Sequence, residues 1–135
     1  MRVQNQLVFL LSLLACAGCG KEKSTDQLIA DLKSHEEGNR INAVRLLPQR
    51  KGEAAKVVPA LTGALKDSEG DIRWSAAIGL GYFGDQAKDA IPALQDAQHD
   101  RDARVREAAG VALSRIDPSR FTAPSKAHSA TGNGP

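Results

Sequence analysis

The sequence has few aromatic residues, only two cysteines and almost no excess of charge. Aromatic side chains make up 4% of its 135 residues, fewer than β-sandwiches and barrels usually draw on. Both cysteines, Cys16 and Cys19, lie near the N-terminus, so none is left elsewhere for a disulfide, a zinc site or a thiol nucleophile. The net charge of +2 argues against nucleic acid as a partner, because such binding needs a strong basic excess.

The sequence also lacks a hydrophobic run long enough to cross a bilayer. The longest apolar run extends from Leu7 to Ala15 and is interrupted only by Ser12. About nine residues fall far short of the ~20 that a membrane-spanning helix requires. They have the length of the apolar core of an export signal, and Arg2 supplies the positive charge that precedes such a core. The N-terminus is therefore predicted to be a signal peptide.

The end of this segment reads Leu13-Leu14-Ala15-Cys16, which resembles the lipobox of bacterial lipoprotein signal peptides. The resemblance implies that a signal peptidase removes residues 1–15 and that Cys16 carries the lipid. Cys19 is the alternative acceptor, because Ala17-Gly18 precede it, although Cys16 then stands where a leucine is expected.

After cleavage, residues 16–24 are expected to tether the protein to a membrane. The anchor would consist of N-terminal acyl chains, of which two or more are needed for stable attachment. The implied location is the bacterial cell envelope, after export from the cytoplasm. Neither cysteine is followed by an aspartate, so the usual inner-membrane retention signal of enteric bacteria is missing and the choice of membrane stays open.

The body of the chain repeats with a period of 33 residues. Val58-Pro59-Ala60-Leu61 recurs as Ile91-Pro92-Ala93-Leu94. One arginine, one alanine and one leucine recur at the same offset: Arg40, Arg73 and Arg106; Ala43, Ala76 and Ala109; Leu47, Leu80 and Leu113. Because every series shares one period without an insertion, the sequence predicts a solenoid of about three similar units.

Each unit is predicted to contain two short helices, because apolar residues recur at helical spacing and alternation with period 2 is absent. The first helices are expected at 28–34, 56–66 and 90–97, and the second helices at 40–47, 71–82 and 103–116. Ser24 with Gln27 fits a capping box, and Asp71 and Asp102 fit helix N-caps. Two prolines are expected near the first turns of their helices, where a missing N–H costs little: Pro59 and Pro92.

The repeats carry a motif that extends across both helices of a unit: Ala64-Leu65-Lys66-Asp67, Asp71-Ile72-Arg73, Ala76-Ala77, Leu80-Gly81 and Gly84-Asp85. With these residues, 25–116 resembles HEAT-type repeats, specifically the short kind named after the phycobilisome lyases. The resemblance implies an all-α fold, a short α-solenoid of helical hairpins. Residues 117–135 show no periodicity and are expected to form a disordered tail.

The recurring arginine has two interpretations. Arg40, Arg73 and Arg106 would form a basic ladder if they served binding. The resemblance implies instead that this arginine pairs with an aspartate or a carbonyl of the neighbouring repeat, and Asp67 and Asp100 are placed to be the partners. We favour the structural role.

Some related repeat proteins hydroxylate a lysine derivative at a di-iron centre, which is held by His-Glu pairs directly after this arginine. No histidine occupies these positions here, and a single carboxylate cannot hold two irons. We therefore predict no metal, no cofactor and no catalytic residue. The residues after the three arginines are Ile41-Asn42, Trp74-Ser75 and Glu107-Ala108.

The resemblance also implies which variable positions face the concave groove. They are Ile41 and Arg45, Trp74 and Ile78, and Glu107 and Val111, with Tyr82 continuing the face. Within each helix they are i, i+4 neighbours and share one face. An exposed Trp74 flanked by isoleucine and tyrosine fits a protein-binding hot spot; the alternative is that it lies flat on the neighbouring repeat and only adds packing. Arg45 and Glu107 would give the groove opposite charges at its two ends.

The sequence therefore predicts a lipid-anchored, non-catalytic interaction or scaffold module that presents a concave helical groove to an unidentified protein partner. The alternative is a lyase-like enzyme or chaperone subunit related to the phycobilisome lyases. An export signal with a lipid anchor fits poorly with the cytosolic task of pigment attachment. Neither nucleic acid nor a small-molecule substrate is indicated.

Overall fold

The computed structural model describes residues 22–121, and within this range all regular structure is helical. The helices are α1 (Thr25–Asp31), α2 (Glu37–Leu46), α3 (Ala54–Ala64), α4 (Gly70–Phe83), α5 (Ile91–Ala97) and α6 (Ala103–Ile116). Three 3-10 segments join them: η1 (Leu47–Gln49), η2 (Lys51–Glu53) and η3 (Gly84–Ala90). No helix in this part of the chain combines the length and apolarity needed to cross a membrane. The predicted signal peptide, both cysteines and residues 122–135 lie outside the described residues.

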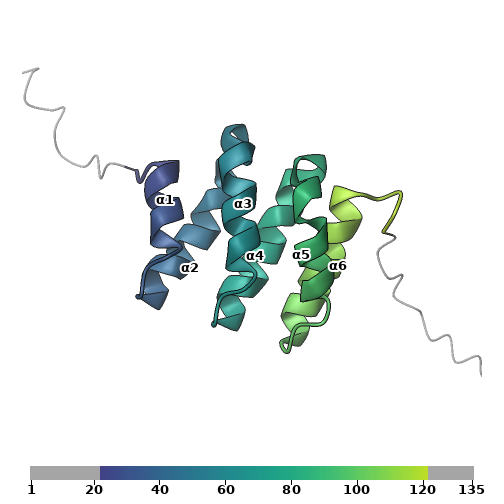
Figure 1. Ribbon diagram of the computed structural model, residues 1–135. Helices are drawn as coiled ribbons and strands as arrows, with labels where there is room; N and C mark the ends of the chain where they lie inside the picture. Colours follow the sequence, from purple (N-terminus) through teal and green to yellow (C-terminus); the bar gives the residue numbers. More distant parts are fainter. Residues whose placement is uncertain (1–21, 122–135) are drawn as a thin grey trace, which may run out of the picture.

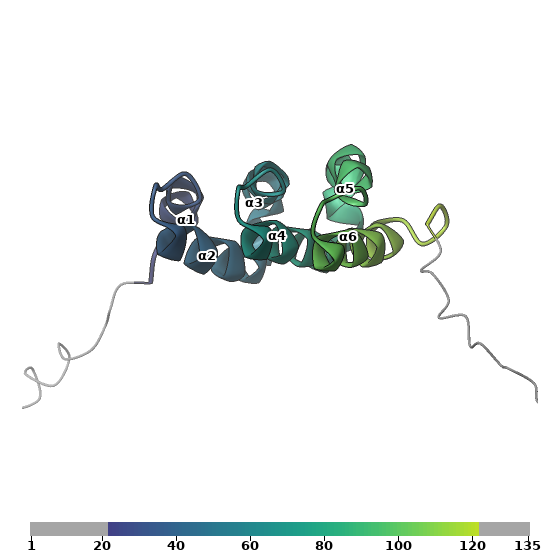
Figure 2. The ribbon, with the colours of Figure 1, turned by 90° about the horizontal axis from the view of Figure 1, so that it is seen from below.

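The α-helices form three hairpins that stack side by side (Figure 1). Seen from below, α1, α3 and α5 form one layer and α2, α4 and α6 form a second (Figure 2). In the second layer α4 packs against both α2 and α6, whereas the helices of the first layer make few contacts with one another. Helices approach most closely on the concave side of a curved stack, so the second layer is the inner one. The predicted all-α solenoid is confirmed.

The helix ends show where capping fixes the start of an element. Ser24 Oγ accepts the Gln27 N–H at 3.2 Å while Gln27 Oε1 accepts the Ser24 N–H at 2.9 Å, so α1 begins at Thr25, three residues before the predicted start. The predicted bounds of α6 are confirmed, with Asp102 Oδ1 accepting the Arg104 N–H at 2.9 Å. Predicted starts elsewhere are one to three residues from those observed.

Two local predictions are wrong. Asp71 does not cap α4: the N-cap residue is Glu69, whose side chain makes no capping bond, and Asp71 is the second helical residue. Its carboxylate instead accepts Arg104 Nη2 of the next hairpin at 2.9 Å. Pro59 lies inside α3 rather than near its first turn, because α3 begins at Ala54, directly after η2. Pro92 does lie in the first turn of α5.

Small residues allow the inner helices to approach closely. Ala43, Ala76 and Ala109 are fully buried. A Cβ atom added to Gly81 of α4 would lie 3.2 Å from the Cα atom and 3.4 Å from the Cβ atom of Ala112 in α6. The spacing of these two helices is therefore set by a glycine that meets the backbone of the next repeat.

The C-terminal boundary differs from the predicted one. Residues 117–121, expected to begin the tail, are placed against the end of α6, and the Phe121 N–H donates to the Asp117 carbonyl at 3.0 Å. The Phe121 ring is partly buried against the core, and the Arg120 guanidinium lies 5.4 Å from its centroid. An aromatic ring thus extends the core past the last helix.

The contact between α4 and α6 gives a testable prediction. Gly81→Leu forces a side chain against helix backbone and is expected to lower the free energy of unfolding by about 1–3 kcal/mol. Gly63→Leu is the matched control, because a Cβ there has no neighbour within 4 Å. Removing a helical glycine at that open site is expected to leave stability unchanged or raise it by up to ~1 kcal/mol. Thermal unfolding of both variants measures the contrast, and equal melting temperatures would contradict it.

Candidate functional site

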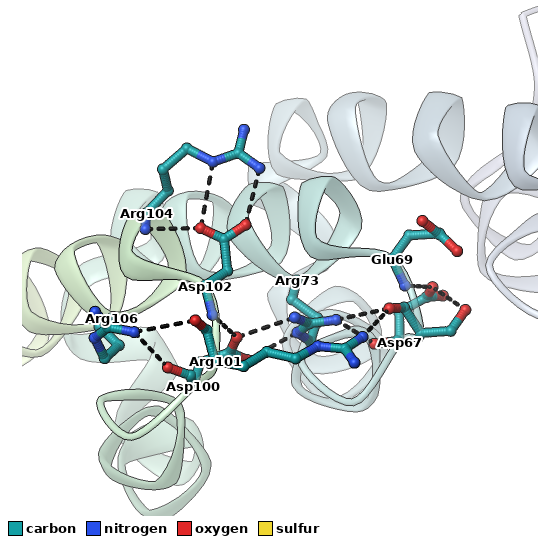
Figure 3. A network of polar contacts seen from close by, with 9 residues as sticks. Asp67, Glu69, Arg73, Asp100, Arg101, Asp102, Arg104 and Arg106 are labelled. Atoms are coloured by element: carbon teal, nitrogen blue, oxygen red, sulfur yellow. Dashed lines mark hydrogen bonds and ion pairs between the residues drawn. The ribbon is translucent and has the colours of Figure 1, made fainter.

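One arginine fixes the spacing of the second and third repeats. Arg73 donates from Nε to Asp100 Oδ2 at 2.8 Å and from Nη2 to Asp100 Oδ1 at 3.0 Å (Figure 3). Its third nitrogen, Nη1, donates to the carbonyls of Asp67 and Ser68 at 2.9 Å each. The guanidinium therefore closes the loop of its own hairpin and holds the loop of the next one.

The same bridge joins the first and second repeats. Arg40 donates to both carboxylate oxygens of Asp67, at 2.9 and 3.3 Å, and to the carbonyls of Ser34 and His35. Within residues 22–121 Arg106 makes only the local half of the pattern, donating to the carbonyls of Asp100 and Arg101. The structural interpretation of the arginine series is confirmed for the first two members.

The electrostatics of the Arg73–Asp100 bridge follow from its geometry. The two side chains are 6% and 11% exposed. The hydrogen bonds from Arg73 hold the pKa of Asp100 below its ordinary value, with a further contribution from the Asp102 N–H, while burial opposes the shift. The carboxylate in turn raises the pKa of Arg73. Both groups stay charged and satisfied, so this bridge holds repeats together and is not free to bind a ligand.

We call the Arg40–Asp67 and Arg73–Asp100 bridges the arginine ladder. Comparing Arg73, which belongs to it, with Arg106, which does not, tests whether the bridge holds the repeats together. Arg73→Ala leaves the buried Asp100 carboxylate without its cation and is expected to lower the free energy of unfolding by about 3–5 kcal/mol. Arg106→Ala removes the same side chain from an exposed position that holds no carboxylate within residues 22–121, and little loss of stability is expected. Chemical denaturation measures both, and a similar loss in the two variants would contradict the ladder.

A pocket of about 450 Å³ lies between α2 with its following turns and the central helix α4. Its walls come from four elements, α2, η1, η2 and α4, which the ladder and the close helix packing hold in place. We call it the concave pocket. It is lined by Val44, Arg45, Pro48, Gln49, Lys51, Trp74, Ser75, Ile78, Gly79 and Tyr82.

Helix α4 supplies the aromatic side of the concave pocket. Trp74, Ile78 and Tyr82 are four residues apart and therefore share one helix face. Trp74 is 37% exposed and Tyr82 57%, while Ile78 is partly buried against the core. The Arg115 guanidinium of α6 lies 5.8 Å from the centre of the Tyr82 ring. The Tyr82 ring is thus contacted by α6, and both aromatic side chains remain accessible to a ligand.

The structure brings together only part of the predicted groove. Arg45, Trp74, Ile78 and Tyr82 line the concave pocket, whereas Ile41, Glu107 and Val111 do not. Ile41 and Val111 are partly buried, and Glu107 is exposed on α6. Sequence reasoning missed six lining residues, of which Pro48, Gln49 and Lys51 lie in turns that the repeat pattern does not cover. The available signal for these turns was Pro48 itself together with Gly52.

Ionisable groups elsewhere do not gather into a metal-binding cluster in the part of the chain that the structure describes: no three His, Cys, Asp or Glu side chains come together there. His35, Glu36 and His99 are exposed, and all three lie between helices.

Comparisons with known proteins agree with this architecture. Residues 25–114 match the protein family described as HEAT repeats. Among solved structures, the complex of CpcE and CpcF of phycocyanin lyase from Nostoc sp. PCC7120 is similar, with a TM-score of 0.65 and 29% sequence identity over 74% of this chain. The alignment covers 40% of the length of that chain. No curated protein matches the sequence.

Proposed function

Because this chain belongs to the HEAT-repeat family, we propose that it is a non-catalytic interaction module that binds a protein segment in the concave pocket. The observation that carries the proposal is the pair of exposed aromatic side chains, Trp74 and Tyr82, on the wall of a single pocket. Tryptophan and tyrosine are the residue types most enriched among interface hot spots.

The scaffold around the pocket supports this role. Helix α4 packs between α2 and α6, and Arg40 and Arg73 tie its repeat to both neighbours. A wall held in this way is ordered before the partner arrives, so little entropy is lost on binding. Trp74 and Tyr82 therefore act as fixed anchor points.

A site-specific crosslinking experiment tests the proposal. A photoreactive side chain introduced at Gln49, an exposed pocket residue, is expected to capture the partner in native envelopes. Trp74→Ala removes an anchor and is expected to lower the captured amount more than tenfold, since hot-spot truncation costs ~2 kcal/mol or more. Leu46→Ala is the control, because Leu46 is similarly exposed at 41% but lies outside this pocket.

The readout separates binding from packing. Melting temperatures are measured for both variants alongside the crosslinks. If Trp74→Ala lowers the melting temperature steeply and leaves the crosslinks unchanged, Trp74 only adds packing and the proposal is wrong.

The proposal includes attachment to a membrane of the bacterial envelope through acyl chains on the N-terminal cysteine. Its support is the resemblance of residues 1–16 to a lipoprotein signal; these residues lie outside the described range. The tether enters the fold at Ser24, the cap of α1. Eight residues from Cys16 span at most about 26 Å, so the solenoid would lie close to the membrane.

Metabolic labelling with palmitate tests the anchor. Cys16→Ala is expected to abolish both the label and the recovery of the protein in the membrane fraction, while Cys19→Ala retains both. The reverse pattern would show that Cys19 carries the lipid. The anchor proposal is wrong if the unchanged protein takes up no label. It is also wrong if the variant that lacks both cysteines is still recovered in the membrane fraction.

The alternative function is a lyase-like or chaperone subunit. It is favoured by the structural likeness to CpcE and CpcF, whose structure is a complex of two proteins. Incubation of the purified chain with a linear tetrapyrrole distinguishes the two functions. An interaction module is expected to leave the absorption spectrum of the pigment unchanged, whereas a pigment-handling subunit is expected to change it.

A further inference from the structure

The concave pocket carries charge of only one sign. Arg45 and Lys51 are its charged lining residues, and no aspartate or glutamate lines it. Both cations are exposed. The rest of the lining is apolar or uncharged, so the pocket combines an apolar wall with a positive rim.

These two cations are available to a ligand. Within residues 22–121 neither Arg45 nor Lys51 takes part in an ion pair. Arg45 lies in the last turn of α2, where the helix dipole favours a cation. A third cation, the Arg115 guanidinium, lies over the ring of the lining residue Tyr82.

Two carboxylates on the adjoining elements make contacts outside the pocket. Glu53, at the end of η2, accepts a hydrogen bond from the buried Thr25 hydroxyl at 2.6 Å. Asp71, at the start of α4, pairs with Arg104 of the third repeat. Neither lines the pocket, and neither forms an ion pair with Arg45 or Lys51 within residues 22–121.

The spacing of the aromatic side chains indicates the size of the ligand. Trp74 and Tyr82 are eight residues apart on α4, which corresponds to roughly 12 Å along the helix axis. An extended chain of about four residues spans this distance. A short peptide segment therefore fits between the two rings, with one side chain directed toward the apolar wall around Ile78.

We infer that the concave pocket selects a peptide segment in which an apolar side chain is flanked by carboxylates. This inference rests on the proposed function and names the chemistry of its partner. The apolar side chain packs between Trp74 and Ile78, and the carboxylates accept charge-assisted hydrogen bonds from Arg45 and Lys51. A basic segment is rejected because it meets like charge at both positions.

Peptide titration tests the inference on the full chain in detergent. Three eight-residue peptides share a central Leu-Phe pair and differ only in flanking Glu, Gln or Lys. Trp74, the single tryptophan of the sequence, reports binding through its fluorescence. The Glu-flanked peptide is expected to bind at least about tenfold more tightly than the Lys-flanked one. The difference is expected to shrink as salt rises to about 0.5 M, because salt screens exposed charges.

Charge-reversal variants locate the effect. Arg45→Glu and Lys51→Glu are each expected to weaken binding of the Glu-flanked peptide by roughly tenfold and to improve binding of the Lys-flanked one. Lys88→Glu is the matched control, because Lys88 is exposed on η3 and outside the pocket. It changes the net charge equally and is expected to leave both affinities unaltered.

The outcomes separate this inference from the proposed function. Equal affinity for all three peptides would overturn the charge selectivity and leave the interaction module intact. The same holds if no peptide binds while the Gln49 crosslink still depends on Trp74, since the partner would then be recognised as a folded surface. An equal effect of Lys88→Glu would reduce the selectivity to net charge and overturn the inference. If no peptide binds, the Gln49 crosslink does not depend on Trp74, and a linear tetrapyrrole alters Trp74 fluorescence, both proposals fail.

Discussion

The bidentate hydrogen bond from Arg73 to Asp100 is the contact on which the rest of the fold depends. The same Asp100 carboxylate accepts the Asp102 N–H at 2.8 Å and so shapes the loop that starts α6. Asp67 does the same for the loop before α4, through the Glu69 N–H at 2.9 Å. One carboxylate therefore organises its own hairpin and holds the preceding one. The loop conformation and the stacking of the repeats therefore depend on the same carboxylates, and the three hairpins are expected to unfold together.

The concave pocket depends on the spacing of the first two repeats, which the Arg40–Asp67 bridge holds together. Its floor includes Gly79, where an added Cβ would lie 2.8 Å from Pro48 Cγ and 3.1 Å from Leu61 Cδ1. Two residues on, Gly81 meets Ala112 of the next repeat. Glycines on opposite sides of α4 thus let this helix approach both neighbours. The close approach at Gly79 places Pro48, in the turn after α2, against α4. The pocket is lined by this proline and by Arg45 and Lys51 on either side of it in the sequence.

Periodicity explains what the sequence predicted and what it did not. The 33-residue offset identified all three hairpins, because similar units stack with one period. The Arg40 and Arg73 pairings came from the family resemblance. The capping role predicted for Asp71 rests on its residue type alone and is wrong. With the 33-residue period, the N-cap residue Asp102 corresponds to Glu69 and not to Asp71. Pro48, Gln49 and Lys51, in the turns η1 and η2, belong to none of the recurring residue series. Periodicity therefore could not identify them as pocket residues. Alignment indicates which face of a helix points inward, but not that Ile41 and Val111 are half covered there.

The ladder has a direction, and this bears on how such a chain grows by duplication. Each arginine reaches forward along the sequence to an aspartate 27 residues later. Arg106 presents the same guanidinium and has its Nε and Nη2 atoms without a carboxylate acceptor in residues 22–121. A hairpin inserted after it needs only an aspartate in its loop to be held at once. A hairpin inserted before α1 would direct its arginine at Ser34, which offers a hydroxyl in place of a carboxylate. Within residues 22–121 the solenoid therefore has an unused guanidinium edge at its C-terminal end and no matching carboxylate at its N-terminal end.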